Sequence, residues 1–145
     1  MKSWLIVWCS LTIISQLVFA QTSRFATSRP LTNSPGDVKN GQDIVMNVEK
    51  SLCLLCHSLK NSQLPFQGTI APELTLMVQD LSAAELRFRL IDSTRINPNT
   101  IMPPYYRTQG LHQVAKPYRG KTLLSAQEIE DVVAYLVRLS HEKKP

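Results

Sequence analysis

The sequence has few of the residues that build disulfide scaffolds, β-sheets or nucleic-acid interfaces. It contains three cysteines and two tryptophans in 145 residues, and Cys9, Trp4 and Trp8 all lie near its start. No run of residues has the alternating pattern of a strand. The net charge of +5 is moderate, and lysine and arginine are less clustered than in a nucleic-acid-binding domain. These absences argue against a disulfide-stapled scaffold, a sheet protein and a nucleic-acid partner.

The first 20 residues have the pattern of a secretory signal peptide. Lys2 supplies a positive start, the stretch from Trp4 to Val18 is mostly apolar, and Ala20 is a suitable cleavage position. Polar residues interrupt the apolar stretch, which is also shorter than the roughly 20 residues of a membrane-spanning helix. We therefore predict export with cleavage after Ala20, rather than an uncleaved anchor, and no stable insertion in a membrane.

One motif in the rest of the chain points to a specific chemistry. It is Cys53-Leu54-Leu55-Cys56-His57, and Cys-x-x-Cys-His is the attachment site of a c-type haem. Its two thiols can add to the two vinyl groups of one haem, and the histidine that follows can bind the iron from one side. The motif predicts one covalent haem c on Cys53 and Cys56, with His57 as the proximal iron ligand.

Two other uses of this motif stay open. A zinc half-site would need two more cysteine or histidine ligands at suitable spacing, and the other candidates are Cys9, His112 and His141. A thioredoxin-like redox pair would follow a strand in a βαβ unit, and no strand is predicted nearby. Both alternatives are therefore weaker than haem attachment.

The chain divides into a signal peptide (1–20), a flexible leader rich in Ser, Thr, Pro and Gly (21–37) and one domain (38–145). Apolar spacing predicts a helix over 38–52 and a terminal helix from about residue 126. The Ser82–Glu85 and Ser125–Glu128 pairs are capping boxes that open two helices, and a helical turn is expected from Glu73. Residues 93–124 form a long loop of the kind that is usually functional.

This layout predicts an all-α, class I cytochrome c-like domain with long loops, in which the first and last helices cross around one covalent haem. Gly41 in the first helix and Tyr135 in the last are the expected crossing pair, because glycine lets two helix backbones approach closely.

The iron needs a second axial ligand unless its sixth position stays open. Met102 lies between Pro98 and the Pro103-Pro104 pair, which stiffen the loop and reduce the entropy lost when a thioether binds. Met46 is too close to the attachment motif to reach the opposite face of the haem, and Met77 is expected to fill the core. His112, from the same loop as Met102, is the alternative distal ligand. We predict Met102 as the distal ligand and the carbonyl of Pro72 as the hydrogen-bond acceptor for His57.

The charges of the long loop have one sign. No acidic residue occurs between Asp92 and Glu128. The basic residues in this interval are Arg95, Arg107, Lys116, Arg119 and Lys121. This basic stretch is either a solvated loop surface or a surface that attracts an acidic partner.

Several segments from about residue 38 to the end resemble SoxX, the small monohaem subunit of the SoxAX complex of thiosulfate oxidation. They are 53–57, 68–74, 82–92, 95–106, 110–116 and 124–136. The haem motif is common to all c-type cytochromes, so the resemblance depends mainly on the loop around Met102 and on residues 110–116.

The resemblance implies a location, partners and a division of labour. It implies a periplasmic heterodimer with a SoxA-like cytochrome, in which thiosulfate is joined oxidatively to a cysteine of the SoxY carrier and electrons pass to an acceptor cytochrome c. The catalytic cysteine is expected on the SoxA-like subunit, so this chain is expected to have no catalytic residue and to serve as a redox subunit. A stand-alone soluble electron carrier and a ligand-binding haem sensor remain the alternatives.

Overall fold

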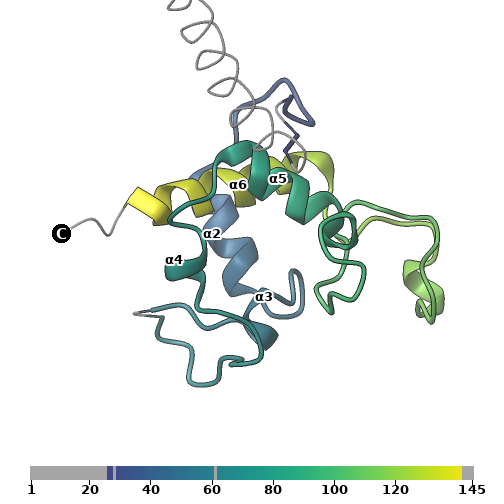
Figure 1. The fold of residues 1–145 in the computed structure, drawn as a ribbon, viewed down its shortest axis with the longest axis horizontal. Helices are drawn as coiled ribbons and strands as arrows, with labels where there is room; N and C mark the ends of the chain where they lie inside the picture. The colour runs from purple at the N-terminus through teal and green to yellow at the C-terminus, as the bar shows by residue number, and fades with distance from the viewer. Residues whose placement is uncertain (1–25, 28, 61, 142–145) are drawn as a thin grey trace, which may run out of the picture.

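The computed structural model describes residues 26, 27, 29–60 and 62–141, so the predicted signal peptide lies outside the described residues. The elements follow in the order α2 (Val38–Met46), α3 (Cys53–Cys56), α4 (Leu74–Met77), α5 (Ala83–Asp92), the 3-10 turns η2 (Ser93–Arg95) and η3 (Lys116–Tyr118), and α6 (Ala126–His141) (Figure 1). This part of the chain contains no strand, which confirms the all-α fold. None of its helices is long and apolar enough to cross a bilayer.

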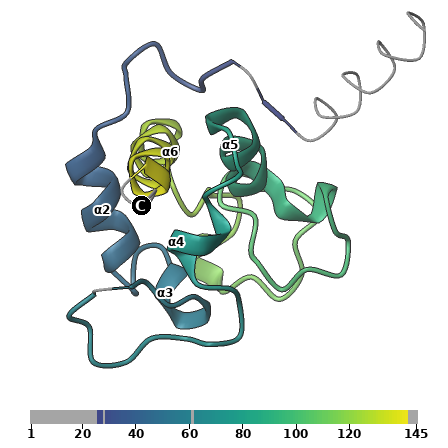
Figure 2. The same cartoon turned by 60° about the vertical axis from the view of Figure 1, so that its left-hand side comes forward.

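α2 and α6 cross in direct contact (Figure 2). A Cβ atom added at Gly41 would overlap the backbone carbonyl of Asp131 and would lie 2.9 Å from the Cβ atom of Tyr135. Only glycine permits so close an approach of the two backbones. The predicted crossing pair of Gly41 and Tyr135 is therefore confirmed.

Local caps define where the longer helices begin. The Ser82 side chain accepts a hydrogen bond from the Glu85 backbone and the Glu85 side chain accepts one in return, as predicted for a capping box. The second predicted box is also present, because the Ser125 backbone N donates to the Glu128 carboxylate at 2.7 Å and the Glu128 N donates to Ser125 Oγ at 3.3 Å. Asp37 is the N-cap of α2, and its carboxylate accepts from the Asn40 N at 3.0 Å.

α2 is shorter than the predicted helix over 38–52, because it ends at Met46. The Asn47 side chain accepts hydrogen bonds from the backbone N atoms of Glu49 and Lys50, at 3.0 and 3.1 Å. Such side-chain acceptors offer the backbone an alternative to helical bonds. The chain therefore turns after Met46 and reaches α3 through Leu52, whose φ of 60° is left-handed.

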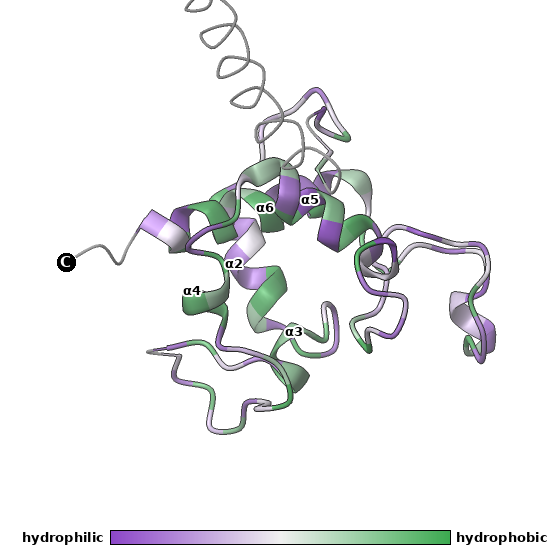
Figure 3. Cartoon of the chain, in the orientation of Figure 1, coloured by the Kyte–Doolittle hydropathy of each residue, from purple (hydrophilic) through white to green (hydrophobic). Residues whose placement is uncertain are grey.

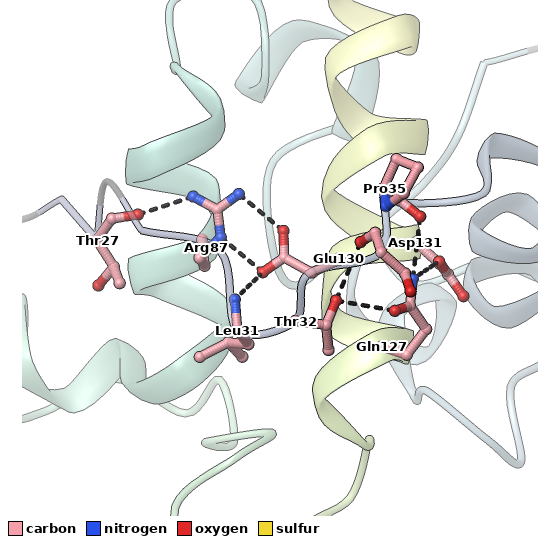
Figure 4. Close-up of polar contacts among 9 residues, drawn as sticks. Thr27, Leu31, Thr32, Pro35, Arg87, Gln127, Glu130 and Asp131 are labelled. Carbon is pink, nitrogen blue, oxygen red and sulfur yellow. Dashed lines mark hydrogen bonds and ion pairs between the residues drawn. The ribbon is translucent and has the colours of Figure 1, made fainter.

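The described part of the predicted leader lies across α5 and α6 (Figure 4). Arg87 of α5 and Glu130 of α6 form a two-pronged ion pair at 2.7 and 2.8 Å, with both side chains 6% exposed. Arg87 also donates to the Thr27 carbonyl at 2.7 Å, and Glu130 accepts from the Leu31 backbone N at 2.9 Å. Residue 27 and residues 29–37 thus form a strap that is hydrogen-bonded to a buried ion pair.

The pKa of Glu130 reflects this setting. Burial acts to raise it, but the hydrogen bonds from Arg87 and Leu31 and the charge of Arg87 outweigh burial and hold the pKa below its usual value. Asp131, the next residue, is also buried. It accepts hydrogen bonds from the Asp37 backbone and the Asn40 side chain at 2.8 and 2.6 Å, so both acids on the inner side of α6 are partnered.

The core follows the apolar stripe that the terminal sequence predicts. α5 and α6 carry both hydrophobic and hydrophilic residues (Figure 3), and the apolar residues of α6 face inward. Those that are buried are Ile129, Val132, Val133, Tyr135, Leu136 and Leu139. Together with α2 and α4 they leave space beside α3, where the candidate site lies.

Candidate functional site

One cavity of about 280 Å³ contains all four residues that the sequence predicts as site residues. Cys53, Cys56 and His57 lie on one wall of it, and Met102 contributes from the long loop. Most of the remaining lining is apolar. It comprises Val45, Leu52, Ile70, Ala71, Pro72, Leu74, Met77, Leu90, Thr100, Ile101, Pro103, Tyr105, Val132 and Leu136. The structure therefore brings residues from distant parts of the chain to a single hydrophobic space.

α3 is a single turn that presents the two cysteines together. Positions three apart on a helix are neighbours on one face, so Cys53 and Cys56 both face the cavity. The backbone N of His57 donates to the Cys53 carbonyl at 3.0 Å, and His57 then adopts an extended conformation. The imidazole thus lines the same cavity as the two cysteines.

Residues 68–71 pack against α3 and fix it by backbone hydrogen bonds. The backbone N of Gly68 donates to the Leu54 carbonyl at 2.8 Å, and the N of Ala71 donates to the Cys56 carbonyl at 2.9 Å. A Cβ atom at Gly68 would overlap the carbonyl of Leu55. Glycine is therefore required here for the loop to lie against the cysteine turn.

The imidazole of His57 has the orientation of a metal ligand. Its Nδ1 lies 2.6 Å from the carbonyl oxygen of Pro72, which is the predicted hydrogen bond. A carbonyl oxygen can only accept, so Nδ1 carries the hydrogen and the lone pair of Nε2 is available to bind a metal. The backbone N of Leu74 donates to the Ser58 carbonyl at 2.9 Å and holds the start of α4 in place beside this histidine.

Two hydrogen bonds hold the backbone of Met102 in place. Its carbonyl accepts from Ser93 Oγ at 2.7 Å, and its N donates to Thr100 Oγ1 at 3.2 Å. His57 directly follows α3, whereas Met102 lies in the loop after η2. The two side chains therefore come to the same cavity from different segments of the chain.

The other candidate ligands differ in position. Met77 lines the cavity as well, although the sequence predicts only core filling for it, but it belongs to α4 on the His57 side. Met46 does not line this cavity, and its sulfur lies 3.9 Å from Ser62 Oγ. His112 is exposed and lines a different cavity. Of the methionines that line the cavity, Met102 is the one that does not come from the segment next to His57.

The environment of the thiols argues against a redox pair. Burial raises the pKa of Cys53 above its usual value, and this effect outweighs the hydrogen bonds from Ser51 and Tyr105. Reactive disulfide-exchanging cysteines instead have a lowered pKa. The zinc alternative gains no support from the described residues, which contain no cluster of three or more His, Cys, Asp or Glu side chains suited to a metal.

One cavity residue was not predicted. The hydroxyl of Tyr105 donates to the Ser51 carbonyl at 2.6 Å and lies 3.7 Å from Cys53 Sγ. Tyr105 is 3% exposed. Nothing in the local sequence signals this contact, because the two partners are 54 positions apart.

The site can accept a flat, largely apolar group held by two thiols and two axial ligands. The donor set of one histidine nitrogen and one methionine sulfur, with two adjacent thiols, fits a c-type haem. The apolar lining fits the ring of such a group. The residues present are thus compatible with the cofactor that the motif predicts.

One solved structure is similar to this chain over most of its length. The crystal structure of SoxXA from P. pantotrophus contains a chain that superposes on this one with a TM-score of 0.73 and 31% sequence identity. The match covers 81% of this chain and 92% of that chain. No protein-family model matches the sequence, and no curated protein matches it either.

Proposed function

This chain belongs to the SoxX family, and on that premise we propose that it is a periplasmic monohaem c-type cytochrome that transfers electrons within a SoxAX complex. The observation that carries the proposal is the meeting of Cys53, Cys56, His57 and Met102 at one apolar cavity. The proposed organisation is a signal peptide (1–20), which is removed on export, and a cytochrome domain from residue 38 onward.

Each site residue has a separate task in this proposal. Cys53 and Cys56 hold the haem covalently, and His57 and Met102 bind its iron from the two sides. The carbonyl of Pro72 keeps the imidazole of His57 oriented, since it accepts from Nδ1 at 2.6 Å. The haem supplies one-electron transfer when it is bound, and a histidine–methionine pair favours a higher reduction potential than two histidines. The apolar lining keeps water away from the ring.

The thiosulfate chemistry belongs to the partner in this proposal. Both described cysteines lie at the haem cavity, so each is committed to the cofactor and neither can carry a sulfur intermediate. We therefore assign no catalytic residue to this chain. The cysteine that activates thiosulfate belongs to a SoxA-like subunit, the sulfur acceptor is the SoxY carrier, and the electrons leave through an acceptor cytochrome c.

The long loop is the proposed docking surface for the SoxA-like subunit. It holds Met102 and the basic stretch, so a partner that binds here lies near the cavity. Three of the basic residues are engaged within the chain. Arg107 pairs with Asp92 at 3.1 Å, and Arg95 lies 4.5 Å above the ring of Phe88. Arg119 Nε donates to the Val114 carbonyl at 3.2 Å.

The remaining charges of the basic stretch suit an intermolecular role. Lys116 and Lys121 are exposed, so an acidic partner can reach their ammonium groups. Charge complementarity of this kind raises the rate of association more than the final affinity.

Reconstitution tests the proposed function. The haem-loaded chain is combined with a SoxA-like cytochrome and the SoxY carrier, and thiosulfate-dependent reduction of an acceptor cytochrome c is followed. We expect no activity from the chain alone and activity from the complex. A chain that remains monomeric in the presence of the SoxA-like cytochrome would instead support a stand-alone carrier, and rapid binding of carbon monoxide by the reduced protein would support a ligand-binding sensor.

A further inference from the structure

Tyr105 connects the loop that holds Met102 to the turn that holds Cys53. It lies three residues after Met102 and is nearly inaccessible to solvent. Its backbone is fixed at both ends, since its N donates to the Leu90 carbonyl at 3.0 Å and its carbonyl accepts from the Leu124 N at 3.1 Å. The side chain contacts the segment that directly precedes Cys53, where its hydroxyl donates to the Ser51 carbonyl at 2.6 Å.

The segment that receives this hydrogen bond is under strain. Leu52, which separates Ser51 from Cys53, has a φ of 60°. A residue with a Cβ atom adopts this left-handed conformation only where its neighbours enforce it. Ser51 is fully buried, and its N donates to the Asn47 carbonyl at 3.0 Å. The Tyr105 hydroxyl fixes the other side of the same residue and so helps to hold the turn that aims Cys53 at the cavity.

The hydroxyl also contacts the thiol itself. It lies 3.7 Å from Cys53 Sγ, and because its one hydrogen is donated to the Ser51 carbonyl, any weak hydrogen bond here is donated by the thiol. Burial is the main cause that raises the pKa of Tyr105, so the group remains a neutral hydroxyl that can donate.

We propose that Tyr105 is a positioning residue that sets the spacing between Cys53 and the Met102 loop across the haem cavity. The inference rests on the proposed haem binding. Loss of the Tyr105 hydroxyl leaves the buried Ser51 carbonyl without this donor. The Met102 loop can then move away from the turn that holds Cys53. The Met102 sulfur is then displaced from iron more readily.

Tyr105→Phe tests the proposal, and Tyr106→Phe is the matched control. Tyr106 is the adjacent residue, is only partly buried, and its hydroxyl makes no hydrogen bond to the residues that the structure describes. Both variants are made in the full chain and loaded with haem. The sulfur-to-iron charge-transfer band of the ferric protein is followed as pH rises, because this band disappears when Met102 leaves the iron.

We expect the equilibrium constant for loss of the Met102 ligand to rise about fivefold in Tyr105→Phe, the equivalent of a buried hydrogen bond of about 1 kcal/mol. Tyr106→Phe should match the unmodified protein. Equal behaviour of the two variants would overturn the role of Tyr105. If the unmodified chain carries no covalent haem, the proposed function itself fails, so the two failures are distinct.

A second measurement needs no variant. In the unmodified protein, the Tyr105 hydroxyl proton should exchange slowly with solvent and show nuclear Overhauser contacts to the β protons of Cys53. A hydroxyl proton that exchanges freely or lacks these contacts contradicts the proposal, whether or not Tyr105→Phe folds.

Discussion

Replacement of Arg87 by methionine should lower the free energy of unfolding by about 3–5 kcal/mol, because it leaves the carboxylate of Glu130 buried without its partner. Both side chains are 6% exposed and share two short contacts, at 2.7 and 2.8 Å. The same change removes the donor to the Thr27 carbonyl, so the strap also loses one of its hydrogen bonds to α5. A domain of this size has a total stability of only about 5–15 kcal/mol.

The assay is guanidinium-induced unfolding of the haem-loaded protein at neutral pH, followed by circular dichroism. Arg89→Met is the matched control, since Arg89 lies on the same helix and is only partly buried. It should cost less than about 1 kcal/mol. Addition of Glu130→Gln to Arg87→Met should restore part of the loss, because the buried group is then neutral but can still accept from the Leu31 backbone.

The pH dependence gives an independent check. In the unmodified protein the folded-state pKa of Glu130 is lowered, so the stability it contributes is present above its unfolded pKa, near about 4.3. That contribution is lost as pH falls through the lower folded pKa. In Arg87→Met the unpaired, buried Glu130 should have a raised pKa. The stability difference between the two proteins should therefore shrink in acid. A loss under about 1 kcal/mol with no such convergence would refute the reasoning.

Two further predictions concern the site and its partner. Met102→Ala should abolish the sulfur-to-iron charge-transfer band and lower the reduction potential by at least about 59 mV, the equivalent of a tenfold loss of preference for ferrous iron. Met77→Leu should keep the band. If only Met77→Leu loses the band, Met77 and not Met102 is the iron ligand. Lys121→Glu should weaken assembly with the SoxA-like subunit by up to about fivefold at low salt and by less at high salt. Unchanged assembly at low salt would show that the basic stretch is a solvated loop surface that does not bind the partner.

The parts of the fold that depend on short-range signals could be predicted from the sequence. The capping boxes at Ser82 and Ser125 act over three residues, and the stripe of α6 repeats at the helical period, so both were predicted and both are present. The contact of Gly41 with Tyr135 was also predictable, because a glycine in the first helix of this fold has a known packing use.

The rest depends on contacts between distant segments. The composition of residues 21–37 predicts a flexible leader. The hydrogen bonds of Thr27 and Leu31 to Arg87 and Glu130 instead depend on how α5 and α6 pack. The hydrogen bond from Tyr105 to Ser51 likewise requires the folded cavity. The early end of α2 was missed for a local reason, since apolar spacing gave no weight to the competing side chain of Asn47.

The mass of the denatured, exported protein tests the central claim most directly. Covalent attachment at Cys53 and Cys56 predicts the mass of the processed polypeptide plus one haem, and this haem should remain bound after extraction with acidified acetone. A polypeptide mass without haem, or a haem that the acetone removes completely, would contradict the account.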